Sequence, residues 1–150
     1  MKNKLFQLLS GHNFTLFAGI GNALKSDDGV GIYISRQIIP RPGWEVLIVE
    51  SGIEKFVGKI NSLAPDLLIL LDATDFGREP GFYDLVPLQQ VRDYTANTHT
   101  VSLSRVGEFF EMETCLLGIQ PADVTFGEII TAPVKASADE LIEIINNLKI

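Results

Sequence analysis

The sequence of 150 residues is poor in the residues that several common kinds of site require. A single cysteine, Cys115, excludes an intrachain disulfide and a zinc site built from several thiolates. Lysine and arginine are outnumbered by acids, 12 to 19, which leaves a net charge of −7. Nucleic acid is therefore disfavoured as a partner, because its phosphates would be repelled by such a surface.

Long hydrophobic runs are also missing. The longest, at residues 67–71, falls far short of the ~18 apolar residues that identify a membrane span. The apolar stretch after Lys2 and Lys4 is too short and interrupted for a secretory signal. Together with the lone cysteine, this predicts a cytoplasmic protein without membrane association, and the length fits one domain over residues 1–150.

Short apolar runs alternate with segments of helical spacing. Near-continuous runs at residues 14–20, 45–49, 67–71 and 115–119 are typical of strands in a parallel sheet whose two faces are both covered. Residues 82–86 follow a Pro-Gly pair and predict a further strand, antiparallel at an edge. Cys115 begins one of these runs, so we expect its thiol to be buried and structural.

Three segments between and after these runs show the spacing of helices. Val30, Ile34 and Ile38 form one apolar face, which the Pro and Gly residues at 40–43 should end. Residues 136–148 form a C-terminal helix with an apolar stripe. A further face is predicted for Val101, Leu103, Val106, Phe109 and Phe110. The alternation predicts an α/β sandwich with helices on both faces of a mostly parallel sheet.

In such folds ligands bind where the strands end, so the residues after each run are the candidates for function. A glycine-rich turn with adjacent acids, Asp27 and Asp28, follows the first run. We expect Ser26 or Asp27 to cap the next helix, which leaves Asp28 available. Asp72 directly follows the run at 67–71, and His99 lies in a polar loop.

These three side chains supply two carboxylates and one imidazole. Such a donor set suits a borderline divalent ion such as nickel, zinc or manganese and leaves coordination positions open. Each also has an ordinary structural interpretation, since acids cap turns and exposed histidines are common. No fixed-spacing motif joins Asp28, Asp72 and His99.

A dinucleotide-binding loop is the alternative interpretation of the glycine-rich turn, with Glu50 in the place of a ribose-binding acid. Two features oppose it. Leu24 occupies the position of the third glycine of that fingerprint. The Asp27-Asp28 pair would repel a pyrophosphate where the helix begins.

The motifs taken together resemble the [NiFe]-hydrogenase maturation endopeptidases over nearly the whole chain. The opening motif of that family is similar to Gly19-x-Gly21-Asn22-x-Leu24-x-x-Asp27-Asp28-Gly29-x-Gly31. Its formate-hydrogenlyase branch is similar at Leu71-Asp72-Ala73-Thr74-Asp75-Phe76-Gly77-x-x-Pro80-Gly81, Thr98-His99, Leu117-Gly118-Ile119-Gln120-Pro121 and Thr131-x-Pro133-Val134-Lys135. One departure is Glu50-Ser51-Gly52, where relatives commonly carry Asp-Gly-Gly.

The resemblance implies a three-layer α/β sandwich around a twisted five-stranded sheet. It also implies an endopeptidase that removes a C-terminal extension from the large-subunit precursor of a [NiFe] hydrogenase once nickel is in place. By position, Asp28, Asp72 and His99 match the nickel-facing residues, as metal ligands and as catalytic groups. The nickel would arrive with the substrate, and the free enzyme is expected to be metal-free. The alternatives are a nickel chaperone that recognises the precursor without cutting it, and a Rossmann-like cofactor-binding module.

Overall fold

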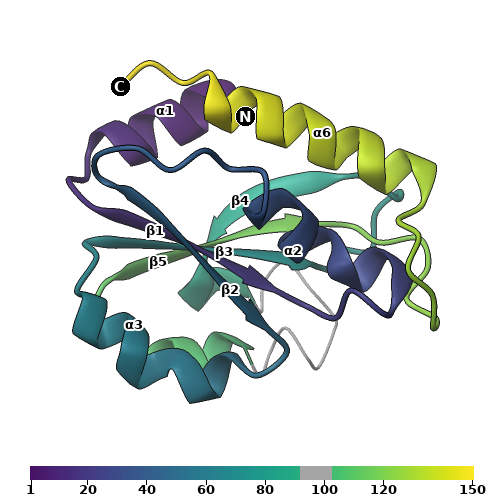
Figure 1. Cartoon of the computed structure of the whole chain (residues 1–150), viewed down its shortest axis with the longest axis horizontal. Coiled ribbons are helices and arrows are strands. Elements are labelled where there is room, and N and C mark those ends of the chain that lie inside the picture. The colour runs from purple at the N-terminus through teal and green to yellow at the C-terminus, as the bar shows by residue number, and fades with distance from the viewer. Residues whose placement is uncertain (92–102) are drawn as a thin grey trace.

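A mostly parallel sheet forms the middle layer of the computed structural model, which describes residues 1–91 and 103–150 (Figure 1). Within these residues the sheet has five strands in the order β2-β1-β3-β5-β4. The strands β2, β1, β3 and β5 are parallel, and β4 pairs antiparallel with β5 at one edge. Both the parallel sheet and its antiparallel edge strand were predicted from the sequence and are confirmed. The strands are β1 (Thr15–Ile20), β2 (Trp44–Glu50), β3 (Leu67–Ala73), β4 (Tyr83–Pro87) and β5 (Glu113–Ile119).

Helices cover both faces of the sheet, as Figure 1 shows. α1 (Lys2–Ser10), α2 (Val30–Ser35) and α6 (Ala132–Asn146) pack on one face, and α3 (Val57–Leu63) packs on the other. Alternate strand residues fill two separate cores, because neighbouring side chains of a strand leave opposite faces. Phe17 belongs to the core under α1, α2 and α6, whereas Leu16 belongs to the core under α3. Such burial on both faces explains why the strands are apolar without alternation.

Short 3-10 helices connect these elements. They are η1 (Ser26–Gly29), η2 (Ile53–Phe56), η3 (Leu88–Gln90) and η4 (Gly107–Phe109). Among the described residues, no helix is both long and apolar enough to cross a membrane.

The helix predictions are confirmed in part. The face of Val30, Ile34 and Ile38 is buried, although α2 ends at Ser35, before the proline-rich segment. The C-terminal helix begins at Ala132, four residues earlier than expected, with Pro133 in its first turn. The N-terminal helix α1 was not predicted: only Leu5 and Leu9 of its residues are fully buried, while the apolar Phe6 is 43% exposed.

The prediction of one apolar helical face over residues 101–110 is wrong at Phe109. Residues 103–106 are helical and Leu103 is buried, but the chain then tightens into η4 and becomes extended at Phe110. This break rotates Phe109 out of the core, so that 68% of it is exposed. Val101 lies outside the described residues.

Cys115 is buried in β5, as expected, and we predict that its thiol is unreactive in the folded protein. Burial, together with the nearby Glu113 carboxylate, raises the pKa of Cys115 to about 11. At pH 8 only about one thiol in a thousand would then be the reactive thiolate. Labelling with Ellman's reagent should therefore be slow in buffer and complete within minutes in denaturant. Rapid labelling of the native protein would contradict a structural role for this thiol.

Candidate functional site

The order of the strands creates a crevice at the carboxyl ends of β1 and β3. From the carboxyl end of β1 the chain turns back through α2 to β2 on one side, and from the carboxyl end of β3 it continues to β4 at the opposite edge of the sheet. The connections that leave the neighbouring strands β1 and β3 therefore diverge. Open α/β sheets bind their ligands at such switch points. Asp28 follows β1 and Asp72 lies near the end of β3, so the topology places both acids at this edge.

Two glycines allow the turn after β1 to pack tightly. Gly21 adopts a φ of +132°, and a Cβ there would collide with the backbone carbonyl of Asp28. At Gly31 a Cβ would collide with the carbonyl oxygens of Leu71 and Ile20, where α2 begins over the ends of β3 and β1. The glycine motif therefore serves close backbone approach, and it holds the Asp28 turn against the sheet.

Asp28 is partly exposed in η1, and its two carboxylate oxygens have different surroundings. Oδ2 accepts a hydrogen bond of 2.9 Å from the backbone N–H of Asn22. Oδ1 accepts none from the part of the chain that the structure describes. One oxygen thus fixes the orientation of the side chain, and the other can bind a cation or accept a proton.

The neighbouring Asp27 has a different role from the one predicted. Neither Ser26 nor Asp27 caps a helix with its side chain. Asp27 is fully buried, and its carboxylate accepts four hydrogen bonds of 2.7–3.0 Å from the loop between β5 and α6. The donors are the backbone N–H groups of Ala122, Asp123 and Thr131 and the hydroxyl of Thr131. Asp27 therefore joins both ends of that loop to the Asp28 turn.

Asp72 and His99 were the other two predicted site residues. Asp72 lies within β3, in register with Gly118 of β5, and is only 2% exposed. Its neighbour Ala73 lines the cleft described below, whereas Asp72 itself does not. His99 falls outside the described residues. In residues 1–91 and 103–150, no group of three His, Cys, Asp or Glu side chains could hold a metal ion.

A cleft of about 570 Å³ opens at this edge of the sheet. The described residues place three carboxylates in it, those of Asp28, Glu54 and Asp75, and one ammonium group, that of Lys25. The excess of negative charge favours a cationic group or a metal held by the substrate. The remaining lining residues are Ile20, Gly21, Asn22, Ser51, Gly52, Ile53, Ala73, Pro121 and Val124.

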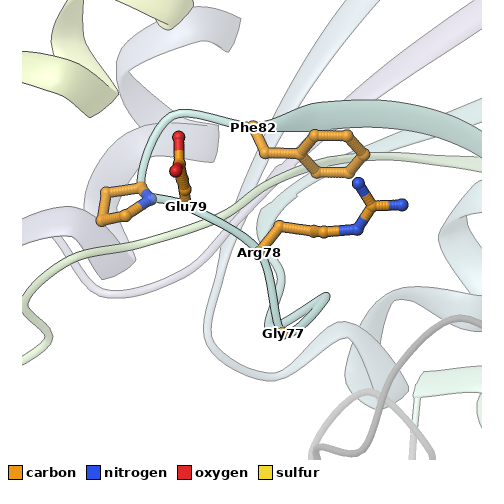
Figure 2. A pocket seen from close by; sticks show the side chains of 5 residues that line it. Gly77, Arg78, Glu79 and Phe82 are labelled. Carbon is orange, nitrogen blue, oxygen red and sulfur yellow. The ribbon is translucent and has the colours of Figure 1, made fainter.

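A second hollow, of about 660 Å³, lies at residues 77–82 (Figure 2). Figure 2 shows the side chains of Arg78 and Phe82 next to each other. The guanidinium carbon of Arg78 lies over the Phe82 ring, 4.8 Å from its centroid. Neither Asp28 nor Asp72 lines this hollow. We therefore place the functional site in the cleft of Asp28 in spite of its smaller volume.

Sequence reasoning missed two walls of this cleft. Residues 51–54 form one wall directly after β2, where Glu50 adopts a φ of +65° that few residues other than glycine favour. The Glu50 backbone carbonyl accepts a hydrogen bond from Gly21 N–H, which ties the end of β2 to the turn after β1. Pro121 and Val124 form another wall. The Leu117–Pro121 motif indicated the start of that segment but gave no sign that it faces Asp28.

Known proteins share this sequence and this fold. A family model described as HycI, hydrogenase maturation protease, matches residues 31–148. The hydrogenase 3 maturation protease of Escherichia coli K12 is 29% identical over 126 residues, which cover 80% of this chain and 81% of that protein. The hydrogenase expression/formation protein HupD of Bradyrhizobium diazoefficiens is 32% identical, covering 82% of this chain and 71% of its own length.

A solved structure supports the same relationship. The crystal structure of the [NiFe] hydrogenase maturation protease HycI from Thermococcus kodakarensis superimposes with a TM-score of 0.77. The two are 26% identical, and the match covers 96% of this chain and 99% of that chain. With the family model matching well over half of the sequence, the chain belongs to the HycI family of hydrogenase maturation proteases.

Proposed function

We propose that this chain removes the C-terminal extension of a [NiFe]-hydrogenase large-subunit precursor after nickel has been inserted. Nickel held by the precursor is the element that the enzyme recognises, and Asp28, Asp72 and His99 are the residues that meet it. The observation that carries the proposal is the Asp28 carboxylate in an acidic cleft at the switch point of the sheet: Asn22 N–H fixes one oxygen, and no described residue donates a hydrogen bond to the other.

The surroundings of the two adjacent acids support this assignment of roles. The carboxylate of Asp27 already accepts four hydrogen bonds and is fully buried, so it is not available to a substrate. Within residues 1–91 and 103–150, Asp28 accepts one hydrogen bond, from the backbone, and it lines the cleft. A carboxylate in that position can bind a metal that arrives with the substrate, or act as the general base for an attacking water.

Recognition of nickel in the substrate ensures that the enzyme cuts only precursor into which nickel has been inserted. Cleavage before metal insertion would release an immature subunit, so an enzyme that requires nickel acts only on loaded precursor. The nickel belongs to the substrate in this scheme, and the acidic cleft need not hold a resident ion. Three ligands with open positions bind an ion less firmly than a closed structural site does.

Incubation of the purified chain with precursor tests the proposal. We expect nickel-loaded large subunit to lose its C-terminal extension, seen as a mass decrease matched by a released peptide. Precursor purified without nickel should keep its full mass under the same conditions. Equal cleavage of both forms would refute nickel recognition. A stable complex with intact, nickel-loaded precursor would instead identify a nickel chaperone, the second candidate function.

A further inference from the structure

The loop between β5 and α6 exposes several large apolar side chains beside the cleft. Phe126 is 86% exposed, Ile129 80% and Val124 49%, and Leu24 in the turn after β1 is 47% exposed. Single exposed apolar residues are ordinary, but a group of them on adjoining segments marks an interaction surface. We call Leu24, Val124, Phe126 and Ile129 the apolar rim.

Hydrogen bonds hold the two segments of the apolar rim together. The backbone N–H of Ser26 donates to Gly127 O at 2.7 Å, and Gly127 N–H donates to Leu24 O at 2.8 Å. The Ser26 hydroxyl donates to Thr125 O at 2.9 Å. In Figure 1 this yellow-green loop lies beside the start of α2. Its backbone is thus fixed before any partner binds, which lowers the entropy lost on binding.

The apolar rim is continuous with the cleft. Val124 lines the cleft together with Asp28, and Leu24 directly precedes Lys25, another lining residue. Asp27 binds the loop on one side and is adjacent to Asp28 on the other. A protein that places a segment in the cleft would therefore cover the apolar rim at the same time.

We propose that the apolar rim is the surface on which the large-subunit precursor docks, through an apolar patch beside the segment to be cut. This inference rests on the proposed function, since the occupant is the substrate assigned there. The net charge of −7 disfavours a partner patch rich in acids. Docking at the apolar rim would position the precursor's nickel over the Asp28 oxygen without adding a group that takes part in the chemistry.

Steady-state processing of nickel-loaded precursor by Phe126→Ser and Ile129→Ser tests the docking surface. We expect KM to rise about tenfold or more for each variant, as for apolar anchors of protein interfaces, with kcat within about twofold of the wild type. The matched controls are Phe109→Ser and Ile39→Ser, which alter residues that are 68% and 64% exposed. Both precede strands at the amino ends of the sheet, and both should process at the wild-type rate. All four variants should keep their thermal midpoints within about 2 °C.

Each outcome distinguishes the docking surface from the proposed function. Wild-type protein that fails to cut nickel-loaded precursor would refute the proposed function itself. Active Phe126→Ser and Ile129→Ser variants with an unchanged KM would overturn the docking surface and leave the proposed function intact. Sedimentation supplies a further check: a wild-type dimer that both rim variants dissociate, with processing unaffected, would assign the apolar rim to a second copy of this chain.

Discussion

Asp28→Asn is expected to slow the processing of nickel-loaded precursor by about 100-fold or more, the range seen when a general base is lost. The amide oxygen of the new side chain can still accept the hydrogen bond that Asn22 N–H gives to Oδ2. The local turn should therefore persist, while the negative charge offered to nickel or to an attacking water disappears. The measurement is the rate of mass loss of the large subunit under saturating precursor.

Glu54→Gln is the matched control for this experiment. Glu54 lines the same cleft and is exposed, so its replacement removes one negative charge from the same place. If the slower processing came only from the reduced negative charge of the cleft, both variants would lose activity to a similar degree. We expect Glu54→Gln to remain within about threefold of the wild-type rate, because screening weakens an exposed charge. Comparable rates for the two variants would remove Asp28 from the site.

Asp27→Asn is expected to destabilise the fold by about 3 kcal/mol, because hydrogen bonds to a charged group contribute ~1.5–3 kcal/mol and a stranded donor adds to the loss. The Asp27 oxygens accept four hydrogen bonds, three at Oδ2 and one at Oδ1. An asparagine oxygen can replace only one of the two acceptors. If it replaces Oδ2, the amide NH₂ faces the N–H of Thr131, and two donors meet in a fully buried place.

Thermal unfolding measures this effect directly. For a chain of this size, about 3 kcal/mol corresponds to a fall of about 6–12 °C in the thermal midpoint. Asp28→Asn makes the same chemical change at the adjacent residue and should leave the midpoint nearly unchanged, since its one described partner keeps an acceptor. The two substitutions thus separate stability from activity. An Asp27→Asn protein as stable as the wild type would show that the buried carboxylate does not hold the loop.

The middle layer of the fold was predictable because its strands are buried on both faces. Such strands are near-continuous apolar runs, and those at 67–71 and 115–119 identified β3 and β5 within a few residues. The Pro-Gly pair before residue 82 identified the antiparallel edge strand in the same way. Local composition was insufficient to predict the helix α1, where only Leu5 and Leu9 mark the buried face. At Phe109 the helical spacing led to a wrong prediction of burial, because a 3-10 turn changes the period of the pattern there.

The Asp27-Asp28 pair shows where sequence reasoning reached its limit. From the sequence alone it was clear that two acids follow the first strand, that Asp72 follows the apolar run of the third strand, and that the chain resembles one family. The sequence also pointed to Asp28, but only the packing of the chain shows why Asp27 is unavailable. The donors that bury Asp27 come from residues 122–131, about a hundred positions away, and no local rule predicts them. Chain folding brings that loop to the Asp28 turn, and the same approach places the apolar rim beside the cleft.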